Sequence, residues 1–205
     1  MSVSAAPQKL KAKTKWLYGI GDIGNALVNS SLQFFLMKFY TDAALILPVL
    51  AGNALLVGKI WDAINDPLFG WLTDRTNSKI GKRRVFMLFG AIPLALSVAL
   101  LWFVPPGLSQ VMTFVWIAGT FIFFDSVWTL TNVPYYALTS ELTDDYDERS
   151  SLTVYRMVLA TPAYLIGAAL TPMIVGFFAV QRTGFAVIGI VYGVIAALAL
   201  LISAG

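Results

Sequence analysis

The strongest chemical signal in the chain is a pair of aspartates inside an otherwise apolar stretch, Lys59–Pro67. Ionisable side chains at membrane depth are costly, and they are kept mostly where they face a bundle interior or a water-filled cavity. Asp62 and Asp66 are four residues apart, so on a helix their carboxylates lie on one face, about a turn apart. Two carboxylates that close repel each other unless a cation or a proton relieves the repulsion. The spacing therefore predicts a cation site.

Neighbouring groups supply further oxygen atoms. The amide of Asn65 lies between the two aspartates, and Pro67 lacks an N–H, which leaves the carbonyl of Ala63 without its helical donor. Amide and carbonyl oxygens, like carboxylates, are ligands that hard cations prefer. An alternative stays open, because Lys59 stands three residues before Asp62 and an internal salt bridge would neutralise one carboxylate. The other aspartate would still need a partner.

A second group of polar residues lies in the apolar segment 110–138. Asp125, Thr129 and Asn132 follow one another at helical spacing and share a face. Three aromatic residues accompany them: Trp128, Tyr135 and Tyr136. Aromatic rings that stack on a sugar, beside amides and hydroxyls that meet its hydroxyl groups, indicate a sugar site. The alternative is an aromatic belt at the membrane interface.

The glycine-rich run Gly19–Gly24 matches the G-x-G-x-x-G pattern of dinucleotide-binding proteins. No strand is predicted before it and it lies in an apolar span, so close helix packing explains it better. Asp22 within this run has no nearby partner in the sequence. We expect Asp22 either to line a cavity or to pair with a cation from another helix.

Composition places these groups in a membrane. The chain of 205 residues is 58% hydrophobic and 12% charged, with a mean hydropathy of +0.76. Apolar segments recur at about the 20 residues needed to cross a bilayer, and nothing alternates with a period of two, so helices are predicted. The predicted spans are 16–40, 44–72, 85–104, 110–138, 153–179 and 183–205. The sequence thus predicts an all-α polytopic membrane protein with a short arm, residues 1–15, and a six-helix bundle, residues 16–205.

Lysine and arginine are distributed unevenly over the connections between these spans. The N-terminal arm and the loops after the second and fourth spans are basic, whereas the connections at 105–107 and 181–182 carry little charge. By the positive-inside rule, both ends of the chain are predicted to be cytoplasmic. The net charge of +3 follows from this topology and gives no reason to expect a nucleic-acid partner.

The chain has no cysteine and no histidine. This excludes disulfides and thiolate chemistry within it, and removes the commonest metal ligand and proton shuttle. Because no nucleophile or metal spacing is present either, an enzyme is not expected. No cofactor is predicted apart from Na⁺ or H⁺ as a coupling ion.

Four segments together carry a resemblance to a known family. They are Trp61-Asp-Ala-Ile-Asn-Asp-Pro67, the loop with Gly70-x-x-x-Asp74-Arg75 and Gly81-Lys-Arg-Arg84, Asn132-Val-Pro-Tyr-Tyr-Ala-Leu138, and Glu141–Arg149. With them the chain resembles, over essentially its whole length, the glycoside–pentoside–hexuronide:cation symporters of the major facilitator superfamily. That family has two six-helix halves that hold the substrate between them near the midplane. The resemblance implies that this chain is the N-terminal half of such a fold, and its end in an apolar run, at Gly205, agrees with a partial sequence.

The resemblance also implies roles for individual residues. In melibiose permeases of this family the coupling cation is bound by residues that correspond here to Asp62, Asn65, Asp66 and Thr129, with Na⁺ expected at Asp62 and Asp66. The implied substrate-binding residues are Asp22, Asn25, Asn132, Tyr136 and Arg156. Asn132 and Tyr136 replace an aspartate and a tryptophan of those permeases, and their first-helix aspartate falls at Ala26. A site with fewer carboxylates indicates a different sugar or a non-sugar solute.

The loop after the second span resembles the charged cytoplasmic clasp that steadies one conformation of transporters in the superfamily. The residues of this cytoplasmic gate are Asp74, Arg75, Gly81, Lys82 and Arg83. A loop that only sets topology would explain the positive charges but not Asp74 or Gly81. Acidic residues in 141–148 are expected to pair with basic residues on the same side, each pair being weak.

Together these features predict a cation-coupled secondary transporter, a symporter that carries a sugar or glycoside with Na⁺ by alternating access. One alternative is a proton-coupled transporter of a non-sugar solute or a lysolipid. Another is a non-transporting protein made from a single transporter half. The expected partners are the lipid bilayer, a sugar-like solute, and either a missing C-terminal half or a second copy of the chain. The expected location is the cell membrane, inner or plasma, with multiple passes.

Overall fold

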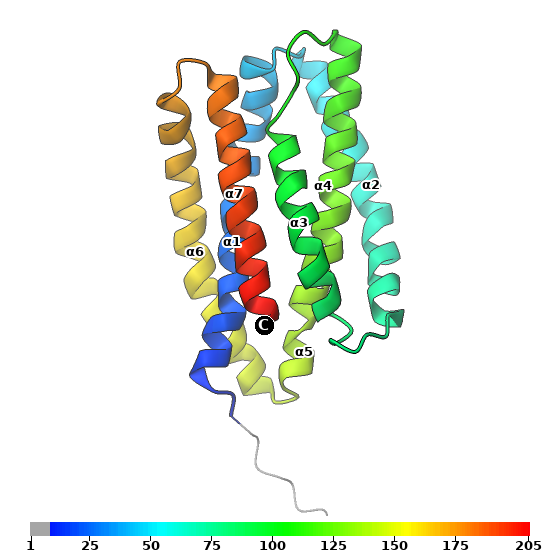
Figure 1. Cartoon of the computed structure of the whole chain (residues 1–205), viewed down its shortest axis with the longest axis vertical. Coiled ribbons are helices and arrows are strands. Elements are labelled where there is room, and N and C mark those ends of the chain that lie inside the picture. Colours follow the sequence, from blue (N-terminus) through cyan, green and yellow to red (C-terminus); the bar gives the residue numbers. More distant parts are fainter. Residues whose placement is uncertain (1–8) are drawn as a thin grey trace, which may run out of the picture.

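A computed structural model describes residues 9–205 and shows six long helices that run up and down a bundle (Figure 1). These are α1 (Ala12–Lys38), α2 (Pro48–Arg75), α3 (Arg84–Leu101), α4 (Gln110–Ala137), α6 (Tyr146–Gly176) and α7 (Gln181–Ala204). A π-helical turn, η1 (Phe39–Ala43), continues α1, and the short α5 (Thr139–Leu142) lies between α4 and α6. Each predicted span corresponds to one long helix, and residues 1–8 of the predicted arm lie outside the described residues.

Two of the long helices, α4 and α6, begin at a side-chain cap. The Ser109 hydroxyl accepts a hydrogen bond from the Met112 amide at 3.3 Å and caps α4. The Asp145 carboxylate accepts one from the Glu148 amide at 2.9 Å, so α6 begins at Tyr146, earlier than the hydropathy pattern predicts. The first turns of α6 are therefore a polar extension of the apolar span.

The helices pack in two groups that meet at α3 and α7. α1 packs against α6 and α7, α3 packs against both α7 and α4, and α2 packs chiefly against α4. The run Gly19–Gly24 lies where α1 meets its neighbours: a Cβ on Gly21 would come within 2.6 Å of the Tyr135 ring, and one on Gly24 would overlap the backbone of Ala196. The prediction that these glycines serve close helix packing is confirmed.

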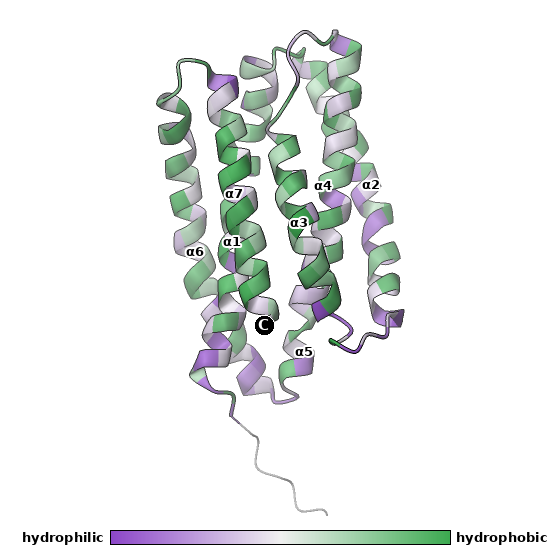
Figure 2. Ribbon diagram, viewed as in Figure 1, coloured by the Kyte–Doolittle hydropathy of each residue, from purple (hydrophilic) through white to green (hydrophobic). Residues whose placement is uncertain are grey.

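Four helical segments of the described chain are long and apolar enough to cross a membrane by length and composition: α3, Gln110–Leu142, α6 and α7. α1 and α2, with 27 and 28 residues, have the length but carry more polar residues. Hydrophilic residues interrupt α2 midway along its length, whereas the rest of the bundle is mainly hydrophobic (Figure 2). Large apolar side chains are exposed on the outside of the bundle, among them Phe89, Ile92 and Leu96. The prediction of an all-α polytopic membrane protein is confirmed.

Candidate functional site

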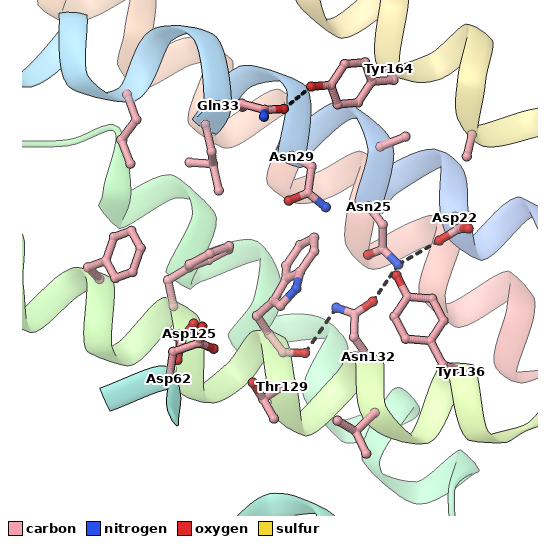
Figure 3. Close-up of a pocket in the computed structure, with 18 of the residues that line it drawn as sticks. Asp22, Asn25, Asn29, Gln33, Asp62, Asp125, Thr129, Asn132, Tyr136 and Tyr164 are labelled. Atoms are coloured by element: carbon pink, nitrogen blue, oxygen red, sulfur yellow. Dashed lines mark hydrogen bonds between the residues drawn. The ribbon is translucent and has the colours of Figure 1, made fainter. Parts of the chain in front are cut away.

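An open cavity of about 1300 Å³ lies between α1, α2, α4 and α6. It brings together polar residues that lie far apart in the sequence, from Asp22 to Tyr136 (Figure 3). All the predicted cation and substrate residues line it except Asn65, which is fully buried behind its wall, and Arg156, which contacts residues that do. The lining residues among them are Asp22, Asn25, Asp62, Asp66, Thr129, Asn132 and Tyr136.

The predicted cation residues form a hydrogen-bonded chain between α2 and α4. The Thr129 hydroxyl donates to Asp66 Oδ1 at 3.0 Å. The Asn65 amide nitrogen donates to Thr129 Oγ1, also at 3.0 Å. The Trp61 indole, which donates to Ser126 Oγ at 2.8 Å, fixes the same helix pair one turn away. The structure thus places Asn65, Asp66 and Thr129 in direct contact.

The internal salt bridge considered from the sequence is present as well. Lys59 Nζ lies 3.1 Å from Asp62 Oδ2, at i,i+3 along α2. The lysine side chain is 64% exposed in this half, so the pair is screened and contributes little to stability. Asp66 makes no ion pair among residues 9–205, and its described partner is the Thr129 hydroxyl.

Asp125 belongs to this group, although the sequence named it only as a polar neighbour of Thr129 and Asn132 and not as a cation ligand. The Asn65 amide nitrogen donates to Asp125 Oδ2 at 3.1 Å and to its backbone carbonyl at 3.2 Å. Asp125 is only 5% exposed, and its carboxyl group lies against that of Asp62 (Figure 3). The sequence did contain a signal for this role, because Asp125 is an ionisable residue in an apolar segment, one helical turn before Thr129.

The donor set fits a hard monovalent cation. Asn65 Oδ1 is completely buried and has no hydrogen-bond partner among residues 9–205, which leaves an amide oxygen free beside carboxylates. In the described part of the chain, no three His, Cys, Asp or Glu side chains are grouped to hold a metal ion. A cation here would therefore be held by a mixture of carboxylate, amide and hydroxyl oxygens, as hard cations prefer.

The predicted substrate residues form a second chain of contacts, from α6 through α1 to α4. Two guanidinium nitrogens of Arg156, Nε and Nη2, each lie 3.0 Å from Asp22 Oδ2. The Asn25 amide nitrogen donates to Asp22 Oδ1 at 3.3 Å and to Asn132 Oδ1 at 2.6 Å. Both expectations for Asp22 are confirmed, since it lines the cavity and pairs with a cation from another helix.

Aromatic rings surround the arginine of this pair. The Arg156 guanidinium lies 4.4 Å from the centre of the Tyr136 ring and 5.5 Å from that of Tyr135. Such cation–π contacts hold the guanidinium in place without neutralising it. Tyr136 is 42% exposed, and its ring lines the cavity beside the Asn25–Asn132 contact (Figure 3). This is the aromatic-plus-amide surface that the sequence indicated.

The predicted gate residues lie at the end of the bundle that contains the start of α1, α5 and the C-terminus (Figure 1). Gly81 has φ +112°, a left-handed backbone conformation that glycine adopts without strain. Arg83 Nε lies 3.2 Å from Glu141 Oε1, and Arg75 stacks on Trp71 at 4.4 Å. Asp74 and Lys82 make no ion pair within residues 9–205. The pair of Arg83 with Glu141 therefore links the basic loop to the connection after α4.

Two further acidic residues near this end, Glu148 and Asp144, find basic partners as expected, whereas Asp145 and Asp147 make no ion pair within residues 9–205. Lys15 Nζ lies 2.8 Å from Glu148 Oε2, with both side chains 11% exposed. The backbone amide of Leu10 donates to the same carboxylate oxygen at 3.0 Å. Arg149 pairs with Asp144 at 3.2 Å on the surface. These contacts fasten the beginning of α1 to the beginning of α6.

Comparison with known proteins agrees with this arrangement. The chain is 41% identical over 181 residues to an uncharacterized symporter, sll1374, of Synechocystis sp., covering 85% of this chain and 32% of the relative. It is 37% identical over 161 residues to the inner membrane symporter YicJ of Escherichia coli, covering 78% and 35%. It is 32% identical over 169 residues to the sodium-dependent lysophosphatidylcholine symporter 1 of Xenopus tropicalis, covering 82% and 32%.

The chain spans about a third of the length of these relatives. A family model described as MFS/sugar transport protein matches residues 17–205, which is nearly the whole chain and includes every residue of the cavity. The family is one of transporters rather than enzymes. The chain belongs to the MFS/sugar transport protein family and forms part of a major facilitator fold.

Proposed function

We propose that the chain is the N-terminal half of a Na⁺-coupled symporter that moves a sugar or glycoside by alternating access. The observation that carries this proposal is that the cation group and the substrate group open onto one cavity. They are also linked through one helix, because Thr129 and Asn132 lie three residues apart on α4. A bound Na⁺ and a bound solute would therefore be neighbours.

Coupling would pass through this shared stretch of α4. Thr129 donates to Asp66 in the cation group, while Asn132 accepts from Asn25 in the substrate group. A cation that neutralises Asp66 would change the hydrogen bond between the Thr129 hydroxyl and that carboxylate. It would thereby bias the position of α4. Two ligands that favour the same arrangement of a helix raise each other's affinity by the same factor.

The polar wall favours a neutral, hydroxyl-rich solute. Arg156 offsets the charge of Asp22, so the substrate group has no net charge. The amides of Asn25 and Asn132 each present donors and acceptors, as sugar hydroxyls require. Trp128 and Tyr136 add ring faces on which a sugar can stack.

A lysolipid is the second candidate, and a specific feature of the cavity favours it. Apolar side chains line the same cavity, including Leu32, Leu36 and Phe121. A solute with one polar and one apolar part would use both kinds of wall. The similarity to a sodium-dependent lysophosphatidylcholine symporter agrees with this candidate.

The proposal extends to place and partners. The protein would be a multi-pass protein of the cell membrane, with the basic end of the bundle on the cytoplasmic side. A second six-helix half, from the same protein or from a second copy of this chain, would close the open side of the cavity. Na⁺ would be the coupling ion, with H⁺ as the alternative.

Uptake into proteoliposomes tests the proposal. The complete transporter, with both six-helix halves, is supplied with radiolabelled methyl galactoside, xylose, glucuronate or lysophosphatidylcholine, with and without an inward Na⁺ gradient. We expect Na⁺ to stimulate uptake of one of the sugars, and Asp62→Asn or Asp66→Asn to abolish the stimulation, because each removes a carboxylate from the cation group.

The matched control is Asp42→Asn, the same chemical change at an exposed position in η1. It should leave uptake and its Na⁺ dependence unchanged. Uptake driven equally well by a pH gradient without Na⁺ would reassign the coupling ion. Full Na⁺ stimulation in both cavity variants would refute the assigned site.

A further inference from the structure

Asp125 is a buried carboxylate to which residues 9–205 supply no ion-pair partner. It is 5% exposed, and the described residues give it no ion pair. Its carboxylate oxygen accepts one hydrogen bond, from the Asn65 amide, and its other neighbour is the carboxyl group of Asp62 (Figure 3). A buried carboxylate that faces a second carboxylate is costly unless a positive charge joins them.

The lysine nearby does not supply that charge for both groups. Lys59 reaches Asp62 Oδ2 at 3.1 Å, but its side chain is 64% exposed and lies on the α2 side. One ammonium group can offset one of the two facing carboxylates. The pair formed by Asp62 and Asp125 therefore keeps an excess negative charge between α2 and α4.

A second, independent observation points to a ligand at the same place. The three hydrogen bonds of the Asn65 amide nitrogen, to the carboxylate and backbone carbonyl of Asp125 and to Thr129, fix which end of the amide is the oxygen. That oxygen, Oδ1, is fully buried and accepts no hydrogen bond from the described part of the chain. An unpaired buried acceptor costs about 1–3 kcal/mol when nothing satisfies it. A cation next to the carboxylates would satisfy it.

We propose that Asp125 is a further ligand of the coupling cation, which it binds from α4 opposite Asp62 on α2. The cation would then be shared by two carboxylates from different helices, together with the Asn65 amide oxygen. Because the ligands come from both helices, binding would draw α2 and α4 together at mid-membrane. This inference rests on the proposed Na⁺-coupled function and adds a residue to it.

Binding of ²²Na⁺ to the purified protein in lipid nanodiscs, without any sugar, tests the proposal directly. Asp125→Asn keeps an oxygen that accepts from Asn65 but removes the charge. We expect it to weaken Na⁺ binding by about tenfold or more, since even supporting residues of metal sites commonly contribute that much. Asp42→Asn, with the same change on the surface, should bind Na⁺ as the wild type does.

The comparison also separates the two hypotheses. Unchanged Na⁺ binding by Asp125→Asn, with loss in Asp62→Asn, would overturn this inference and leave the Na⁺-coupled function standing. Absence of Na⁺ binding in the wild-type protein would refute the coupling ion itself. If Asp125→Asn does not fold, Asp125→Glu and Asp125→Gln replace it, because they have the same size and differ in charge. Equal Na⁺ affinities in the Glu and Gln variants would also overturn the inference.

Discussion

Asp22 and Arg156 have opposite charges at one side of the cavity, and each is largely buried. Their side chains are 12% and 20% exposed, and two guanidinium nitrogens reach the same carboxylate oxygen. Bringing two charges out of water costs free energy that their attraction only balances when both are present. The pair therefore adds little net stability, but each residue needs the other in order to be buried in the helix bundle.

This leads to a prediction for a double-mutant cycle. Asp22→Asn or Arg156→Gln alone leaves one buried charge unpaired and should destabilise the protein by about 3 kcal/mol. The double variant should be more stable than either single variant, because no charge remains. Thermal unfolding in detergent measures all four proteins. Strictly additive losses of stability would show that the two residues act independently.

Tyr136 and Asn132 show how single residues set what the cavity accepts. The Tyr136 ring lines the cavity, and the Arg156 guanidinium lies over the ring, 4.4 Å from its centre. Asn132 has its amide oxygen occupied by Asn25 and its amide nitrogen by the Trp128 carbonyl. A solute that replaces these bonds must offer both donors and acceptors, which hydroxyl groups do.

At the scale of helices, α1 depends on glycines to approach its neighbours. Gly24 → Ala should lower the melting temperature, because the added methyl group would overlap the backbone of Ala196 on α7. The matched control is Gly119→Ala on α4, where a Cβ meets nothing within 4 Å. It should be neutral or slightly stabilising, since alanine favours helix more than glycine does. A melting temperature of Gly24→Ala equal to that of the control would contradict close packing at this position.

The sequence predicted elements better than contacts between them. Hydropathy located all six long helices, because a helix of lipid-facing residues has a distinct composition. It placed the start of α6 too late, because the Asp145 cap acts outside the apolar span. The spacing of Asp62 and Asp66 indicated a shared face, which local periodicity can do.

Contacts across helices had no such local signal. Asp125 meets Asn65 from a position 60 residues further along the chain, and nothing in the spacing of either segment specifies that distance. The ion pair between Arg83 and Glu141 had no local signal either, because Asp74 is the nearer acidic residue in the sequence. Resemblance to a known family supplied Thr129 and Arg156, but it offered no reason to choose Asp125.

At the scale of the whole molecule, charge and connectivity divide the bundle into two ends. The start of α1, the loop between α2 and α3, and α5 lie at one end, and the connection between α6 and α7 lies at the other (Figure 1). The ion pairs of Lys15 with Glu148 and of Arg83 with Glu141 both lie at the first end. This asymmetry of charge matches the rule that basic loops stay in the cytoplasm.

Orientation in the membrane can be tested with single cysteines, because the chain contains none of its own. Lys79→Cys lies in the basic loop between α2 and α3, and Gln181→Cys lies at the start of α7 at the other end; both positions are exposed. We expect a membrane-impermeant maleimide to label Gln181→Cys on intact cells and to label Lys79→Cys only after permeabilisation. Lys79→Cys therefore controls for leakage and Gln181→Cys for reactivity. Labelling of Lys79→Cys on intact cells, with protection of Gln181→Cys, would place the basic end outside and reverse the direction in which the cavity must open.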